Sequence, residues 1–268
     1  MVESAELAKQ RQDNPSHDKT LFQKSDSGFH LQWGSNETKA KMAQTIAMSM
    51  KQRLEPLMEV KEQNGDEGNR DQTREKQVKV LDFGCGEGGI TIGLSEDVGA
   101  IVGVDPSASA IKAFESKISE DGPCSFARRN TTAIQLNLLE EPLSERAQQF
   151  LDENRESFDI VVCSLTFHHI EHVDQVVSVM NALLKREQGV ICVCDVLKTE
   201  NSDCFHPLGP SRKHVFHLGG FSEDQVFQLL QGNGFHRINF EEFTIEKEDA
   251  ETGELTPFPL FLVTAVKL

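Results

Sequence analysis

Residues 80–89 read Val80-Leu81-Asp82-Phe83-Gly84-Cys85-Gly86-Glu87-Gly88-Gly89, a short apolar run that leads into four glycines. An apolar run that ends at a Gly-rich turn predicts a strand followed by the start of a helix. Glycines at such a turn let a ligand approach the backbone closely, and the N–H groups at the helix start favour a carboxylate or phosphate. The stretch therefore predicts a binding loop at the end of a strand.

Strand and helix patterns alternate along the chain after this loop. Apolar runs predict strands at residues 78–83, 100–104, 133–136, 158–165 and 189–196, and the segments between them predict helices at 90–98, 107–118, 144–154 and 173–185. Such alternation is typical of an α/β fold with a parallel sheet wrapped by helices. A helix that is capped by Ser222 and stopped at 232–234 precedes two strands, at 237–248 and 257–267, which we expect to be antiparallel.

The first 77 residues have a different organisation. Residues 1–20 are polar without a period, which is typical of a frayed tail. Apolar residues then recur every four positions from Met42 to Leu54, which predicts an amphipathic helix that begins near Ser35-Asn36 and ends at Pro56. We therefore expect a tail and helical cap at 1–60, a polar linker at 61–77 and the main domain at 78–268.

The composition excludes several partners and locations. The chain has 268 residues, with 27 Lys and Arg against 43 Asp and Glu, and its net charge of −16 disfavours nucleic acid and anionic membranes. No apolar stretch approaches the roughly 20 residues of a membrane span, and the first 20 residues lack a signal-peptide pattern, so we expect a cytosolic protein. The Cys192-x-Cys194 spacing and the scattered His206, His214 and His217 favour no metal site.

The glycine run alone is compatible with two cofactor classes. It fits both G-x-G-x-G and G-x-G-x-x-G, so it does not separate S-adenosylmethionine (SAM) from a nicotinamide dinucleotide. Asp105, 19 residues after Gly86, is placed to bind ribose hydroxyls of either ligand. Asp82 favours SAM, because a carboxylate at that position repels a pyrophosphate and attracts the amino group of a methionine moiety.

Residues 78–268 resemble a class I, seven-stranded SAM-dependent methyltransferase and are most similar to its small-molecule branch, which includes ubiquinone and menaquinone biosynthesis enzymes. The resemblance rests on the glycine loop, Gly103-Val104-Asp105-Pro106, Asn137-Leu138, the run Phe158–Ser164, and His168-His169-Ile170. It implies a doubly wound, Rossmann-like sheet that is mostly parallel with an antiparallel C-terminal strand. It also implies SAM as the cofactor and S-adenosylhomocysteine (SAH) as its product.

The same resemblance implies which residues bind the cofactor. They are Asp82, Phe83, Gly84, Cys85 and Gly86 around the methionine part, Asp105 at the ribose, Pro106, Asn137 and Leu138 at the adenine, and Ser164 and Leu165 at the sulfonium. Asn137 stands where many relatives have Asp, and its amide oxygen keeps the ability to accept from the adenine amine. Structural roles remain as alternatives to cofactor binding. Asn137 also suits a turn, and Asp159 lies at the start of a strand, where a structural role is expected.

Histidines are the candidate general bases, because the ordinary pKa of histidine lies near neutral pH. His168 and His169 follow the fourth predicted strand, where ligands of open α/β sheets bind, and His217 lies in a long loop that suits a lid. We expect His168, His169 and His217 to be catalytic, and Trp33 and His214 to line the acceptor pocket. The alternative for each histidine is a packing role or a hydrogen bond to a backbone carbonyl.

The sequence therefore predicts an enzyme that transfers a methyl group from SAM to an O, N or S atom of a small molecule. Three alternatives stay open: a protein or peptide methyltransferase on the same fold, a non-catalytic SAM-binding partner subunit, and a nicotinamide enzyme. A general base is optional in this chemistry, because the methyl group of a sulfonium is already activated and alignment supplies much of the acceleration.

Overall fold

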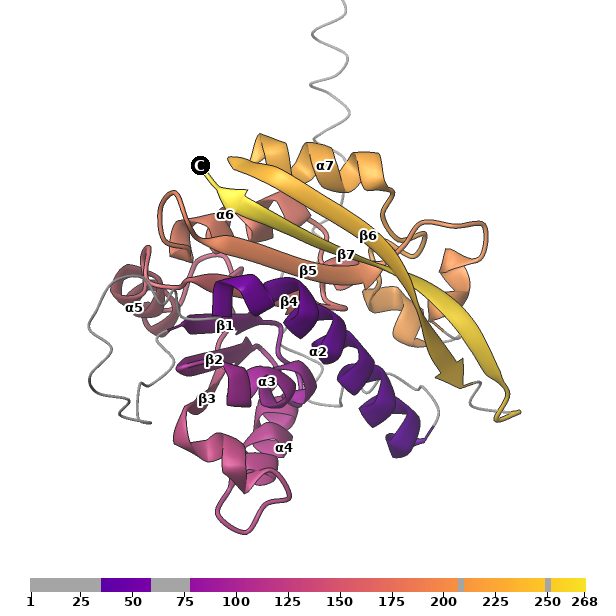
Figure 1. Ribbon diagram of the computed structural model, residues 1–268, viewed down its shortest axis with the longest axis horizontal. Coiled ribbons are helices and arrows are strands. Elements are labelled where there is room, and N and C mark those ends of the chain that lie inside the picture. Colours follow the sequence, from indigo (N-terminus) through magenta and orange to yellow (C-terminus); the bar gives the residue numbers. More distant parts are fainter. Residues whose placement is uncertain (1–34, 59–77, 207–209, 249–251) are drawn as a thin grey trace, which may run out of the picture.

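The computed structural model describes residues 35–58, 78–206, 210–248 and 252–268, and its centre is a seven-stranded sheet (Figure 1). The strand order is β3-β2-β1-β4-β5-β7-β6. The strands are β1 (Lys79–Phe83), β2 (Ala100–Asp105), β3 (Thr131–Gln135), β4 (Ile160–Ser164), β5 (Val190–Val196), β6 (Phe235–Glu248) and β7 (Leu255–Lys267). The predicted fold class is thereby confirmed.

Of the seven strands in this sheet, β7 runs opposite to the other six. β1 to β5 pair in parallel, whereas β7 runs antiparallel to both β5 and β6. The strand order reverses between β1 and β4. From β1 the chain continues to β2 and β3 on one side of the sheet, and β4 and β5 then follow on the other side. In open α/β sheets, ligands bind outside the carboxyl ends of the strands at this reversal. The glycine loop after β1 therefore lies at the expected place.

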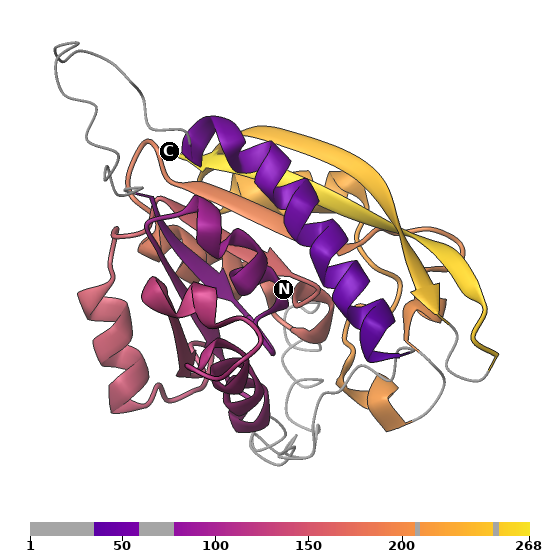
Figure 2. The ribbon, with the colours of Figure 1, turned by 60° about the horizontal axis from the view of Figure 1, so that its bottom comes forward.

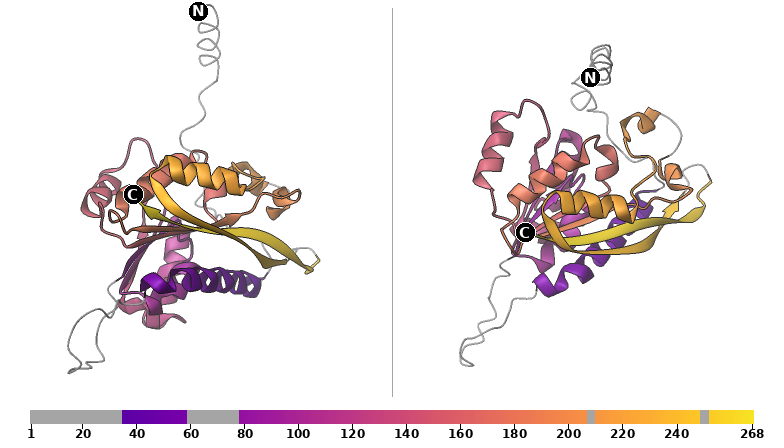
Figure 3. Two further views of the ribbon diagram at one scale, coloured as in Figure 1. Left: turned by 45° about the horizontal axis from the view of Figure 1, so that its top comes forward. Right: turned by 90° about the horizontal axis from the view of Figure 1, so that it is seen from above.

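Helices cover both faces of the sheet, as Figures 2 and 3 show. The helices are α2 (Asn36–Met58), α3 (Gly89–Leu94), α4 (Ala108–Ile118), α5 (Glu145–Glu153), α6 (Val173–Leu183) and α7 (Glu223–Gly232). One apolar core joins the sheet to α5, α6 and α7, and a second joins the opposite face to α2 and α3. Ile191 and Val193 of β5 point into the first core and Cys192 and Cys194 into the second, so this apolar run is covered on both faces.

Local capping fixes where several helices begin. Ser107, Ser144 and Ser222 each accept a backbone hydrogen bond at the start of α4, α5 and α7. The Gln225 side chain completes a capping box with Ser222, as the spacing predicts. Short 3₁₀ helices fill the connections: η1 (Ser95–Asp97), η2 (Ser125–Arg129), η3 (Phe167–His169), η4 (Ser202–Phe205) and η5 (Pro210–His214).

The expected end of the first helix at Pro56 is wrong. α2 continues through Pro56 to Met58. Proline removes one backbone hydrogen bond and crowds the preceding turn, but Leu54 and Met58 on the same face are both buried in the second core. Apolar burial on both sides of Pro56 therefore stabilises the last turn of the helix beyond the proline.

Small residues bring α2 close to the start of the main domain. A Cβ atom added at Gly93 would lie 2.7 Å from the Cβ of Ala47, and one added at Gly89 would lie 2.9 Å from the Cβ of Ala43. Because Gly89 and Gly93 are four residues apart, they lie on one face of α3 and form the surface on which α2 packs. Figure 2 shows α2 lying across this side of the sheet.

Side chains of β6 also hold α2 in place. Glu248 accepts hydrogen bonds from the backbone N–H and the hydroxyl of Ser35, both at 3.0 Å, at the start of the helix. Arg53, near the other end of the helix, pairs with Glu241. None of the described helices is long and apolar enough to cross a membrane. The predicted tail, the polar linker and Trp33 lie outside the described residues.

Candidate active site

A cavity of about 1630 Å³ lies at the carboxyl edge of β1, β2 and β4. Its walls come from the ends of these strands, from the loops that follow them and from one side of α2. Figure 2 shows the indigo helix α2 beside the strands of the parallel half. The predicted cap helix therefore contributes a wall of the cavity.

The glycine loop after β1 has a backbone that side chains would disturb. Gly84, Gly86 and Gly88 have φ angles of 76°, 52° and 80°, a region that L-residues rarely adopt. A Cβ at Gly84 would lie 2.5 Å from the Thr166 hydroxyl, whereas a Cβ at Gly86 would meet nothing within 4 Å. The loop therefore packs tightly against the β4 side at Gly84 and opens towards the cavity at Gly86.

Asp105 at the end of β2 holds this loop in position. Its carboxylate accepts the backbone N–H of Gly86 at 2.9 Å and that of Ser107 at 2.8 Å. Burial raises the pKa of Asp105 above its ordinary value, although both backbone hydrogen bonds act in the opposite direction. A carboxylate oxygen accepts more than one hydrogen bond, so the group can hold the loop and still bind hydroxyls in the cavity.

Asp82 is a buried carboxylate beneath the loop. Its side chain is 1% exposed and accepts a hydrogen bond from the Thr91 hydroxyl at 2.5 Å. Burial raises the pKa of Asp82 from 3.8 to about 7, although the Thr91 hydrogen bond lowers it. Because Asp82 also lines the cavity, a cationic ligand group there would stabilise its ionised form.

The structure brings every predicted cofactor residue to the same cavity. Besides the loop, the lining includes Phe83, Cys85, Pro106, Asn137, Leu138, Ser164 and Leu165. The Asn137 side-chain oxygen accepts the backbone N–H of Leu139 at 3.0 Å, so it also forms the turn that the sequence left as an alternative. Leu165 has a φ of 50°, and such backbone strain outside glycine concentrates at ligand sites.

Two residues around the loop receive an explanation that the sequence did not supply. Glu87 of the glycine loop forms an ion pair with Lys117 at 3.0 Å. Thr166 lines the cavity, and its hydroxyl donates to the Ser164 carbonyl at 2.9 Å. Asp159, by contrast, accepts the Lys79 backbone N–H and the Lys185 ammonium group, which supports the structural interpretation.

Of the three histidines predicted to be catalytic, His169 lines the cavity. Its Nδ1 atom lies 3.1 Å from the backbone carbonyl of His214, so Nδ1 carries the proton and donates. Burial has the larger effect and, together with the neighbouring His168, lowers the pKa of His169 to about 4. The ring is therefore neutral at pH 7. His214 is connected to the site through its backbone.

His168 is buried behind His169. It is 1% exposed, and its Nδ1 atom lies 2.5 Å from a carboxylate oxygen of Asp195, a fully buried residue of β5 that the sequence analysis did not select. Burial acts to raise the pKa of Asp195, but the adjacent His168 outweighs it, and the net pKa is lowered. The only signal in the sequence was an Asp inside an otherwise apolar strand.

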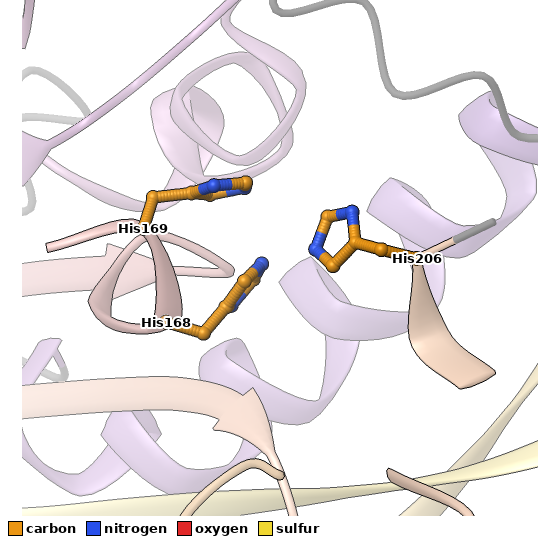
Figure 4. Close-up of side chains that lie close together, drawn as sticks. All are labelled: His168, His169 and His206. Carbon is orange, nitrogen blue, oxygen red and sulfur yellow. The ribbon is translucent and has the colours of Figure 1, made fainter. Parts of the chain in front are cut away.

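Another histidine joins this pair from the segment between β5 and α7. The ring centroid of His206 lies 5.0 Å from that of His168 and 5.1 Å from that of His169 (Figure 4). Burial lowers the pKa of His206 to about 3. His217 is placed differently: its ring packs on Phe221 at 4.9 Å, and it is not among the residues that line the cavity.

Comparison with known proteins agrees with this geometry. Residues 81–191 match the family model described as a methyltransferase domain. Residues 81–191 therefore form a methyltransferase domain. The match covers the glycine loop, Asp105 and the histidine pair, whereas α2 and His206 lie outside it.

Two curated relatives carry the same kind of name. An uncharacterized methyltransferase of Schizosaccharomyces pombe (strain 972 / ATCC 24843) is 29% identical over 158 residues, which are 58% of this chain and 52% of that protein. The mitochondrial ubiquinone biosynthesis O-methyltransferase of Mus musculus is 30% identical over 125 residues, which are 47% of this chain and 30% of that protein. The chain thus spans about half of the first relative and less of the second.

Solved structures share the fold of the methyltransferase domain. A magnesium protoporphyrin IX methyltransferase from Synechocystis PCC 6803 with bound SAM aligns with a TM-score of 0.56 over 95% of this chain and 100% of its own, at 15% identity. A SAM-dependent methyltransferase from Archaeoglobus fulgidus aligns with a TM-score of 0.55 over 86% and 97%, at 16% identity.

The residues in the cavity fit SAM. The open space at Gly86 lets a ligand contact the backbone. Asp82 offers a carboxylate to a cationic ligand, and Asp105 offers acceptors to hydroxyls. A dinucleotide pyrophosphate would instead place its negative charges beside these two carboxylates, which is unfavourable.

Proposed function

We propose that this protein transfers a methyl group from SAM to an O, N or S atom of a small-molecule acceptor. The size of the cavity carries the proposal. Its volume of about 1630 Å³ exceeds the roughly 300–1,000 Å³ of a site for one small ligand. A cofactor in contact with the glycine loop would therefore leave room for a second small molecule in the same cavity. The name of the mouse relative, an O-methyltransferase of ubiquinone biosynthesis, supports a small acceptor.

In this proposal the protein acts mainly by alignment. SAM supplies a methyl group that is already activated by the sulfonium. Asp82 attracts the ammonium group of the cofactor, Asp105 binds its ribose, and the loop backbone fixes its orientation. Such positioning contributes roughly 7–11 kcal/mol to the lowering of a barrier of this kind. α2 closes one wall, which limits the access of water to the reacting atoms.

His169 is the histidine that we assign to the acceptor side. It lines the cavity, and its Nδ1 proton is committed to the His214 carbonyl. With a pKa of about 4, it is neutral at pH 7 and a weak proton acceptor. We therefore place it as a polar lining group on the acceptor side of the cavity, and not as the base that removes the acceptor's proton.

Calorimetry with SAH tests the cofactor part of the proposal in a matched pair of variants. Gly86 and Gly253 have φ angles of 52° and 70°, and a Cβ at either would meet nothing within 4 Å. Both Gly86→Ala and Gly253→Ala should therefore lose roughly 1–2 kcal/mol of stability. Only Gly86→Ala, whose methyl group enters the loop that lines the cavity, should lose SAH affinity, by at least about tenfold.

Acceptor chemistry is tested by SAH release in a screen of small hydroxyl, amine and thiol compounds. Turnover with a member of this set, lost in Asp105→Ala, is the expected result. Binding of SAH without turnover on any small molecule, together with methylation of peptides, would overturn the small-molecule assignment. Absence of SAH binding in the wild-type protein would overturn the proposal as a whole.

A further inference from the structure

We propose that His168, His169 and His206 form a binding site for a divalent transition-metal ion, of the class to which Zn²⁺ belongs. Each of the three offers one ring nitrogen, and these nitrogens all lie within 4.8 Å of one another. Figure 4 shows the three rings gathered around a common space, two from the turn after β4 and one from the end of η4. The third histidine, His206, lies outside the residues that match the family model.

The hydrogen bonds around the cluster are those of histidines prepared to bind a metal. A metal-bound histidine almost always donates its second ring N–H to a carboxylate or a backbone carbonyl, which fixes the ring orientation. His168 Nδ1 lies 2.5 Å from the Asp195 carboxylate, and His169 Nδ1 lies 3.1 Å from the His214 carbonyl. Both Nδ1 atoms are thus committed to acceptors, and Nε2 is the nitrogen that each ring offers to an ion.

A buried atom of His168 points to the same conclusion. The side chain is 1% exposed, and its Nε2 atom has no hydrogen-bond partner among the described residues. A buried polar atom without a partner destabilises the folded state, and such an atom in a native structure calls for a ligand or an ordered water. The Asp195 carboxylate, which also accepts the Val196 backbone N–H at 2.7 Å, holds the ring in this orientation.

The required adjustment is small. Zn–N distances of about 2.0–2.1 Å in a tetrahedral site place the ligand nitrogens about 3.4 Å apart. The span of 4.8 Å therefore has to contract by about 1.4 Å, which side-chain rotation of His206 can supply. Phe205 packs on both His168 and His206, with centroid distances of 5.4 and 5.3 Å, and forms an apolar side of the site.

The donor set selects the kind of ion. Three imidazoles suit Zn²⁺, Co²⁺, Ni²⁺ or Cu²⁺, whereas Mg²⁺ and Ca²⁺ prefer oxygen ligands. Three protein ligands leave a fourth position for water or a substrate atom, as in catalytic zinc sites. Because His169 also lines the cavity, an ion held here lies at its edge, where it would polarise an acceptor hydroxyl or thiol. This role rests on the proposed function, whereas ion binding does not.

Metal titration of the full-length protein tests the site without any turnover. Protein stripped with a chelator is titrated with Zn²⁺, and with Co²⁺ as a coloured probe, and bound metal is counted by mass spectrometry. We expect one ion per chain, the visible absorption of tetrahedral nitrogen-bound Co²⁺, and no effect of Mg²⁺. His206→Ala and His206→Gln should lose this ion, whereas His172→Ala, which changes an exposed histidine outside the cluster, should keep it.

Two further measurements separate a metal site from a packing role. Zn²⁺ should raise the melting temperature of the wild type and of His172→Ala but not that of His206→Gln. Asp195→Asn should weaken Zn²⁺ binding by about 10- to 100-fold, the usual effect of removing a group that orients a ligand. Retention of a stoichiometric ion in both His206 variants, or failure of the wild type to bind Zn²⁺ or Co²⁺, would overturn the proposal. SAH calorimetry on the same samples reports separately on the cofactor site.

Discussion

Replacement of Asp82 by Asn tests whether a buried, titrating carboxylate lies under the glycine loop. In the folded protein its pKa is about 7, against an ordinary 3.8, so between these values the folded state holds a proton that the unfolded state has released. The stability that this group contributes is therefore present at acid pH and is lost as the pH rises through 7. Asn keeps the shape and the acceptor for Thr91 but cannot ionise.

The expected magnitude follows from these two values. Between pH 5.5 and 8, the wild type should lose about 2 kcal/mol of unfolding free energy relative to Asp82→Asn. Urea unfolding of both proteins at a series of pH values measures this difference, in which contributions from all other titrating groups cancel. Asp152→Asn, at an exposed position of α5, is the control and should follow the wild type. Parallel curves for Asp82→Asn and wild type would refute the reasoning.

SAH binding gives an independent test of the same carboxylate. Its affinity should rise with pH, whereas the stability contribution of Asp82 falls. The ionised form of Asp82 attracts the ammonium group of SAH, so affinity should rise by about eightfold from pH 6 to pH 7.5 in the wild type. Asp82→Asn should bind weakly and without this pH dependence. Thr91→Val removes the hydrogen bond that lowers the Asp82 pKa, so its binding curve should shift to higher pH. A wild-type affinity that is independent of pH in this range would contradict the predicted contact.

Three other predictions concern the walls of the cavity. Asp105→Asn leaves one buried backbone N–H, that of Gly86 or Ser107, facing an amide NH₂ group. Thermal unfolding should therefore show a loss of about 1–3 kcal/mol of unfolding free energy, and calorimetry should show weaker SAH binding. Gly93→Ala forces a Cβ to 2.7 Å from that of Ala47 and should lose about 1–3 kcal/mol in urea unfolding, and Ala47→Gly in the same chain should restore part of it. Glu248→Ala removes exposed contacts to the start of α2 and should leave the midpoint of urea unfolding almost unchanged.

The cofactor side of the site was predictable because its signals are local. The apolar run to Phe83, the glycines after it and Asp105 at the end of the next strand all lie within residues 78–105. Parallel pairing of β1 and β2 then brings the two strand ends together with no further information. Loop backbone and strand ends are determined by local pattern and topology, so fold and cavity followed from the sequence.

The histidine cluster was not predictable for the opposite reason. His206 is separated from His169 by 36 residues that include α6 and β5, and no spacing indicates that the segment after β5 folds back onto the turn after β4. The expectation of no metal site considered His206 together with His214 and His217 along the sequence. The structure instead places it beside His168 and His169. Similarly, Pro56 indicated a helix end because the burial of Met58 beyond it depends on the tertiary fold.

The cofactor side of the site and the parts around it therefore come from different segments of the chain. The cofactor side lies within residues 81–191, the part of the chain that matches the methyltransferase family model. α2 and His206, which contribute a cavity wall and the third histidine, lie on either side of that range. Substrate specificity often differs between proteins in segments outside the shared fold, while the reaction itself stays the same. The acceptor of this protein should therefore depend on α2 and on the segment after β5, and variants at these positions should change acceptor preference while SAH binding stays intact.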